Sequence, residues 1–289
     1  DEGPAGEWIE IETLVGDGPD PGTEEARTAR QGTEPIIVGQ DLDIEVRIDD
    51  GQAEVQAMTT GVTDADEELA DEAVAGAEGI MPLPSAPTMA QGQTLVLDQA
   101  QASVQSAAVN RGLTYTSRAQ WGANEKLRRC TPSTTSSNKA MVVHHTAGAT
   151  NYTKAQVPGI LRGILTYHTQ SLGWCDMGYN MLVDRYGTVY EGRSGGVDKA
   201  VVGAHASGFN TGTFGVSVMG TYTSPAPKAA VDALGRVGAW QADRWGYDPA
   251  GKVTLTSSGG GSVKHGKGKK VSLPRIFGHR DTSYTACPG

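Results

Sequence analysis

The stretch Met141-Val142-Val143-His144-His145 decides the fold of the second half of the chain. Three consecutive apolar side chains, two of them β-branched, favour a strand that is covered on both faces. A strand over Lys139–His145 would end at the two histidines, and side chains at strand ends commonly build sites. The sequence therefore predicts a buried strand that carries an imidazole to a functional site.

Further helices and strands are expected on both sides of this strand. Apolar residues at helical spacing predict helices over Ala155–Gln170 and Pro227–Trp245, the second with its proline at the start, where proline is tolerated. Strand patterns cover the hairpin Tyr179–Asp184 and Thr188–Glu191, then Phe214–Met219, and the lysine- and glycine-rich region Lys252–Ser272. Because helices interleave with strands and hairpins, we expect an α/β fold with a mixed central sheet flanked by helices.

The N-terminal part of the chain has a different composition. Residues 1–60 contain strand-like segments such as Asp41–Ile48 and a strong turn at Asp17–Gly22, so a small acidic β-rich unit is expected there. Residues 61–115 are rich in Ala, Gln and Pro, which is typical of a linker. The remaining unit is expected to span residues 116–289.

The net charge of −9 hides a split between these parts. Residues 1–110 carry 24 acidic residues against 3 arginines, whereas residues 111–289 carry 9 acidic residues against 21 basic ones. A cationic unit attracts polyanions such as nucleic acid, an anionic membrane or an anionic cell wall, and an ordinary solvated surface is the alternative. No apolar run approaches the roughly 18 residues of a membrane span.

A three-ligand metal set can be assembled from distant parts of the basic unit. The terminal stretch Gly278–Gly289 places His279 and Cys287 eight positions apart, and one of the strand-end histidines, His144 or His145, supplies a second imidazole. Zinc takes nitrogen and sulfur ligands, and a site with three protein ligands keeps a fourth position for water. Such an open position is typical of a hydrolytic zinc ion.

The histidines differ in what their positions suggest. Adjacent residues of a strand point to opposite faces, so His144 and His145 are not expected to bind one ion, and the spacing does not say which of them points inward. His205 lies in a glycine-rich loop and is a candidate site residue, whereas His168 continues a helical apolar stripe and is more often packed. His265 lies in a Gly/Lys loop and is expected to be solvated.

Two cysteines remain if Cys287 binds metal. Cys130 and Cys175 lie in segments rich in turn-forming and polar residues, which favours a disulfide over two buried free thiols. A disulfide would indicate an oxidising compartment. The chain starts at Asp1 without a signal peptide, so we expect a secreted or cell-wall-associated protein whose leader has been removed.

Five short strings of the basic unit are more specific than the spacing of single residues. They are Val142-Val-His-His-Thr-Ala-Gly148, Gly178-Tyr-Asn180, Tyr190-Glu-Gly-Arg193, Gly203-Ala-His-Ala-Ser-Gly-Phe-Asn210 and Gly278-His-Arg-Asp281 with Ala286-Cys-Pro-Gly289. Together they resemble the type-2 N-acetylmuramoyl-L-alanine amidases and the peptidoglycan recognition proteins over residues 116–289. The front part, with Gly18-Pro-Asp-Pro-Gly22 and Thr33-Glu-Pro35, resembles secreted actinobacterial members.

The resemblance implies a Zn²⁺ site and a reaction. It assigns His144, His279 and Cys287 as the zinc ligands, and the cysteine favours an enzyme because recognition proteins that only bind commonly have serine there. The bond cleaved would join N-acetylmuramic acid to L-alanine. Tyr179 matches the family tyrosine beside the zinc-bound water, although on its own it is a typical core tyrosine. Thr285 replaces the lysine of phage-type members, which leaves open which group protonates the leaving amine.

The resemblance also implies substrate contacts. Gly173 and Trp174 match a pair associated with diaminopimelate-type peptidoglycan stems, and Arg193 matches the arginine that pairs with the extra carboxylate of diaminopimelate. An arginine–carboxylate contact can be bidentate, which is a sound basis for that choice. The positions that match the peptide-lining residues of recognition proteins are Thr146, His168, Tyr179, His205 and Asn210.

Three functions remain open at this point. The first is a monomeric zinc amidase acting on peptidoglycan, with no nucleic-acid partner. The second is a non-catalytic peptidoglycan-binding module that has kept its zinc. The third makes the zinc structural, with His145 or another residue closing its shell. The opposite charges of the two parts add the hypothesis that the acidic unit docks over the catalytic residues.

Overall fold

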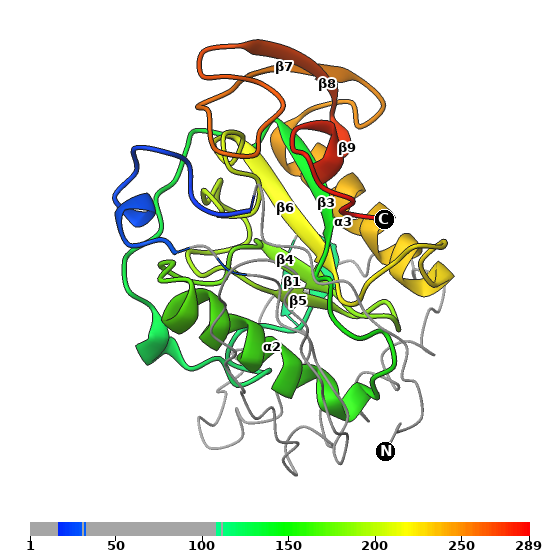
Figure 1. The fold of residues 1–289 in the computed structure, drawn as a ribbon. Coiled ribbons are helices and arrows are strands. Elements are labelled where there is room, and N and C mark those ends of the chain that lie inside the picture. Colours follow the sequence, from blue (N-terminus) through cyan, green and yellow to red (C-terminus); the bar gives the residue numbers. More distant parts are fainter. Residues whose placement is uncertain (1–16, 31, 33–107, 111) are drawn as a thin grey trace, which may run out of the picture.

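A five-stranded mixed sheet forms the centre of the molecule in the computed structural model, which describes residues 17–30, 32, 108–110 and 112–289 (Figure 1). The order is β5-β4-β6-β3-β9, in which β3 runs parallel to β6 and β9, β4 runs parallel to β6, and β5 is antiparallel to β4. The strands are β3 (Ala140–His145), β4 (Met181–Val183), β5 (Val189–Glu191), β6 (Thr213–Val218) and β9 (Ile276–Gly278). The expected α/β fold with a mixed sheet is therefore confirmed.

Helices α2 (Val157–Thr166) and α3 (Lys228–Trp245) cover opposite faces of this sheet (Figure 1). The alternation along β4 shows it, because Leu182 packs in the cluster of α2 whereas Met181 and Val183 pack in the cluster of α3. Such alternation follows from the two-residue repeat of a strand. β3 directs His144 to the side of the sheet that α2 covers, because its ring contacts that of Tyr179, a member of the α2 cluster.

Most differences from the expected elements lie at their ends. The first helix is preceded by the 3-10 turn η3 (Lys154–Gln156) and ends in the π-helical turn η4 (Tyr167–Ser171), and the second helix begins after Pro227 instead of at it. The region expected as one β-like stretch forms the antiparallel ribbon of β7 (Lys252–Thr256) and β8 (Lys270–Pro274). The remaining elements are the hairpin β1 (Ala108–Asn110) and β2 (Leu113–Tyr115), η1 (Glu25–Arg27), η2 (Glu125–Leu127) and η5 (His279–Asp281).

The predicted disulfide is present. Cys130 and Cys175 are bonded, with their Cα atoms 5.2 Å apart, and they join the segment before β3 to the segment after η4. Among the residues that the structure describes, no helix is both long and apolar enough to span a membrane.

The N-terminal unit and linker expected at 1–60 and 61–115 lie largely outside the described residues. Their described part includes residues 17–30, which contain bends at 18–19 and turns at 21–22 followed by η1. This segment, blue in Figure 1, runs along the rest of the described chain, to which its backbone is hydrogen-bonded at Ala204 and Leu172.

Candidate metal and substrate site

The three expected metal ligands lie together. Ligand atoms of His144, His279 and Cys287 are within 4.8 Å of one another, and all three residues are buried. The sheet explains the meeting of the two histidines, because β3 pairs with β9 through Val143 and Gly278, and each histidine is the next residue of its chain segment. Their ring centroids are 4.6 Å apart, and Cys287 Sγ lies 3.7 Å from His144 Nδ1.

The structure also separates His144 from His145. His144 contacts the rings of Tyr179, His205 and His279 on the face that α2 covers. His145 has the opposite direction, and its Nδ1 accepts a long hydrogen bond of 3.5 Å from the backbone N–H of Tyr222, a residue of the core cluster under α3. The expectation that the two imidazoles would not share one ion therefore agrees with the geometry.

The backbone of β3 also forms a hydrogen bond with the side chain of Cys287. The N–H of His145 donates to Cys287 Sγ at 3.3 Å, and the N–H of Cys287 donates to the hydroxyl of Thr285 at 3.1 Å. N–H donors favour a charged sulfur, which is the form that binds metal. Thr285 is thus placed as a residue that orders the Cys287 loop.

The chemistry of this donor set fits zinc. Burial, followed by the nearby His279 and His205, lowers the pKa of His144 well below its ordinary value, so its imidazole stays neutral. A metal ligand must be deprotonated, and two imidazole nitrogens with one thiolate form a set that Zn²⁺ prefers. These residues therefore fit a zinc ion with one position left for a further ligand.

His205 and Tyr179 complete the buried cluster around His144. His205 Nδ1 lies 3.1 Å from His144 Nε2, so the other nitrogen of His144, Nδ1, is the one that faces Cys287. Such a contact fixes the orientation of a ligand imidazole. The ring of Tyr179 lies 5.3 Å from that of His144, which brings its hydroxyl group to the same cluster.

Asp17 is a site residue that sequence reasoning missed. Its Oδ1 lies 3.4 Å from His279 Nδ1 and 3.8 Å from His144 Nδ1, and the hydroxyl of Tyr179 donates to its Oδ2 at 3.5 Å. The sequence indicated only a turn at this position. The acidic charge of the N-terminal part was the one available signal, and it singles out no residue.

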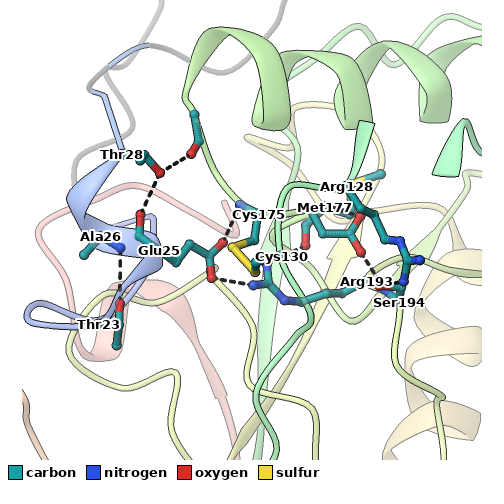
Figure 2. Close-up of a disulfide and its surroundings, with 12 residues drawn as sticks. Thr23, Glu25, Ala26, Thr28, Arg128, Cys130, Cys175, Met177, Arg193 and Ser194 are labelled. Carbon is teal, nitrogen blue, oxygen red and sulfur yellow. Dashed lines mark hydrogen bonds and ion pairs between the residues drawn. A yellow bond between two sulfur atoms is a disulfide. The ribbon is translucent and has the colours of Figure 1, made fainter. Parts of the chain in front are cut away.

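Arg193, the candidate for recognition of a stem carboxylate, holds a carboxylate of the same chain (Figure 2). Its guanidinium is buried, donates to the carbonyl of Met177 at 3.0 Å and pairs with Glu25 at 2.5 Å. The other carboxylate oxygen of Glu25 accepts from the backbone N–H of Cys175 at 2.9 Å. The position is therefore suited to a carboxylate.

The candidates on and after η4 form a packed layer. The rings of His168 and Trp174 lie 4.5 Å apart, and His168 Nδ1 accepts from the N–H of Gly178 at 3.1 Å. Burial, followed by the charge of Arg193, lowers the pKa of His168 to about 3. Gly173 adopts a left-handed backbone with φ of 70°, and its carbonyl accepts from the hydroxyl of Thr28 at 2.8 Å.

The last two candidates are bound to backbone groups. Asn210 accepts from the N–H groups of His205 and Ala206 through Oδ1, and its Nδ2 donates to the Gly18 carbonyl at 2.8 Å. The hydroxyl of Thr146 accepts from the N–H of Gly220 at 3.0 Å. The structure thus gathers the metal candidates around His144 and leaves Thr146 at the end of β3.

The chain is similar to known proteins of one family. The family model for N-acetylmuramoyl-L-alanine amidase matches residues 134–289. Peptidoglycan-recognition protein SC2 of Drosophila melanogaster is 34% identical over 181 residues, which cover 62% of this chain and 82% of that protein. Peptidoglycan recognition protein 1 of Bos taurus is 36% identical over 115 residues, which cover 39% and 57%. The solved structure of Drosophila PGRP-LB has a TM-score of 0.47 at 25% identity and covers 61% of this chain and 87% of that one.

The matches cover enough of the chain to establish its family. The family model spans more than half of the chain, and the alignment covers more than two thirds of the SC2 protein. The chain therefore belongs to the family of the N-acetylmuramoyl-L-alanine amidases and peptidoglycan-recognition proteins.

Proposed function

We propose that this protein is a zinc-dependent amidase that hydrolyses the bond between N-acetylmuramic acid and L-alanine in peptidoglycan. The observation that carries the proposal is the buried cluster of His144, His279 and Cys287, with ligand atoms within 4.8 Å of one another. A zinc ion held there would supply Lewis-acid polarisation of the scissile carbonyl and lower the pKa of water. A module that only binds the wall has no need of a thiolate in this set.

The residues around the ligands have distinct tasks in this proposal. His205 orients His144 through the 3.1 Å contact between their nitrogens. The ring of Tyr179 lies 5.3 Å from that of His144. Its hydroxyl group would donate a hydrogen bond to the oxyanion that develops at the scissile carbonyl. Thr285 holds the Cys287 loop through the Cys287 N–H. The burial of these groups excludes water that would weaken the hydrogen bonds.

A diaminopimelate-type stem is the proposed substrate. Arg193 is 3% exposed, and its guanidinium pairs with the carboxylate of Glu25, so a stem carboxylate that replaces Glu25 would keep a charged partner there. A lysine-type stem carries no carboxylate at this point, so once it displaced Glu25 it would leave the buried guanidinium without a partner. Comparing hydrolysis of the two stem types tests this preference, and faster cleavage of lysine stems would contradict it.

The proposed place of action is outside the cell, on the wall, and the protein is proposed to act as a monomer. The disulfide between Cys130 and Cys175 supports this location, since such bonds persist in oxidising compartments.

A non-catalytic peptidoglycan-binding protein is the second candidate. The relatives reported above are named for recognition, which favours it. The full chain and its His144→Ala variant distinguish the two, with His265→Ala in the β7–β8 loop as the control. An enzyme loses zinc and turnover in His144→Ala alone, whereas a binder shows no turnover in any of the three proteins.

A further inference from the structure

We propose that residues 17–30 are an intramolecular inhibitor of this site, in which Asp17 supplies the fourth ligand of the metal and Asp20 and Glu25 hold the segment on the substrate-contacting residues. The proposal rests on the proposed function, because it deepens the account of the same site. It is carried by three carboxylates of one short segment, each of which meets a different part of the site.

The position of Asp17 is that of a ligand. Its Oδ1 lies 3.4 Å from His279 Nδ1 and 3.8 Å from His144 Nδ1. These distances are similar to the 3.7 Å between Cys287 Sγ and His144 Nδ1. Bond lengths of about 2.0–2.3 Å in tetrahedral geometry place zinc ligand atoms roughly 3.3–3.8 Å apart. The carboxylate therefore lies at ligand spacing from the two histidine nitrogens, and in this proposal it takes the position that a hydrolytic site keeps for water.

Asp20 anchors the segment beside Asn210. Its side chain is 4% exposed, and Oδ1 accepts from the N–H of Gly208 at 2.8 Å and from Asn210 Nδ2 at 3.0 Å. Oδ2 accepts from the Thr211 hydroxyl at 2.9 Å. A buried carboxylate with several donors is held firmly, since hydrogen bonds to a charged group are about twice as strong as neutral ones.

Glu25 occupies the proposed carboxylate position. It pairs with Arg193 and accepts from Cys175 N–H, and the nearby Thr28 donates to the Gly173 carbonyl (Figure 2). Glu25 thus takes the place of the extra carboxylate of a diaminopimelate stem.

The backbone of the segment is attached at both ends. Gly18 N–H donates to the Ala204 carbonyl at 3.1 Å, and Arg30 N–H donates to the Leu172 carbonyl at 2.7 Å. Gly18 has φ of 124°, and a Cβ there would lie 3.6 Å from the indole of Trp174. The segment and a muramyl peptide need the same groups of Arg193 and Asn210, so they exclude each other.

Covalent connection makes this competition strong. A tethered ligand acts at an effective concentration on the order of millimolar, without loss of overall translational freedom. A free muramyl peptide must displace the segment before it binds, so the segment raises its apparent Kd.

The metal ligand is tested first, with full chains loaded with zinc or cobalt. Asp17→Ala and the nearly isosteric Asp17→Asn are compared with Glu24→Ala, which removes an exposed carboxylate of the same segment. We expect zinc affinity to fall about tenfold or more and the visible cobalt spectrum to change in both Asp17 variants but not in Glu24→Ala. Zinc affinity and spectra equal to those of the wild type would overturn the assignment of Asp17.

The inhibition is tested with the full-chain triple variant Asp17→Ala/Asp20→Ala/Glu25→Ala, again beside Glu24→Ala. We expect the triple variant to bind a soluble diaminopimelate-type muramyl peptide about tenfold or more tighter than the wild type and to hydrolyse it faster. Binding no tighter than that of the wild type would overturn the inhibition. Tighter binding with no hydrolysis in any variant would support the inhibition and contradict only the proposed enzyme.

Discussion

His144 and His205 are joined through their ring nitrogens, with Nε2 of the first 3.1 Å from Nδ1 of the second, and both imidazoles are fully buried. The family resemblance implied a substrate contact for His205, yet its Nδ1 meets a ring nitrogen of a candidate zinc ligand. This places it as a positioning residue for the metal site.

Replacing His205 should therefore weaken the metal site. We expect His205→Ala to lower zinc affinity about 10- to 100-fold, the usual effect of removing a partner of a ligand imidazole. Competition with a chelator measures it, with His265→Ala as the control. Unchanged zinc affinity together with weaker muramyl peptide binding would show that His205 acts on the substrate instead.

Cys287→Ser should separate catalysis from binding. A serine hydroxyl is not deprotonated as a thiol is, so we expect zinc affinity to fall more than about 100-fold and hydrolysis to be lost. Muramyl peptide binding, measured in the Asp17→Ala/Asp20→Ala/Glu25→Ala background, should remain. Full hydrolysis by the serine variant would show that the thiolate is not needed.

Arg193→Lys should reduce the preference for diaminopimelate stems. Lysine keeps the charge but not the planar pair of donors, and a hydrogen bond to a charged group contributes about 1.5–3 kcal/mol, or roughly 10- to 100-fold. The ratio of kcat/KM for the two stem types measures the change in the Glu25→Ala background. Arg236→Lys, on the exposed face of α3, is the control. An unchanged ratio would mean that another residue selects the stem.

The Cys130–Cys175 disulfide should stabilise the fold. The bond closes a loop over a sequence separation of 45, for which chain entropy gives about 4 kcal/mol. Urea unfolding of the Cys130→Ser/Cys175→Ser variant, compared with the wild type, measures the free energy of unfolding. A loss well below 1 kcal/mol would indicate that the hydrogen bonds of Arg129 to the carbonyls of Cys175 and Thr169 hold the two segments together.

The buried His168 predicts a pH dependence of stability. Its pKa is about 3 in the folded protein because of burial, against about 6.5 in the unfolded chain, so its contribution is complete above pH 6.5 and is lost as the pH falls toward 3. The loss reaches about 3 kcal/mol at pH 4. Urea unfolding between pH 7 and 4 should show a shallower decline in His168→Gln than in the wild type. The control His265→Gln, at a partly exposed position, should decline as steeply as the wild type. A decline of the same steepness in His168→Gln would contradict this prediction.

The elements that could be predicted from the sequence are those whose apolar residues recur at a regular spacing. The alternation and apolar runs of β3 and β6 and the helical spacing of α2 and α3 arise from local geometry, so a single segment reveals them. β9 was missed because three residues are too few to show a period, and it is a strand only through its pairing with β3.

The candidate site, too, could be predicted from the sequence only where local geometry determines it. Strand alternation predicts that His144 and His145 point apart, but only the packing of α3 on one face decides which of them joins His279. The contacts of Asp17 and Glu25 join residues more than one hundred positions apart, and local patterns contain no information on such pairs. The charge split led to the hypothesis that the acidic part docks over the catalytic residues, but it did not indicate which carboxylates would make the contacts.

Zinc content and amidase activity, measured together on the full-chain Asp17→Ala/Asp20→Ala/Glu25→Ala variant, test the central claim most directly. The account predicts about one zinc per chain, release of the stem peptide from purified diaminopimelate-type peptidoglycan, loss of both on chelation, and recovery of both when zinc is restored. His144→Ala should show neither. Release of the stem peptide that persists after the metal has been removed would contradict the account.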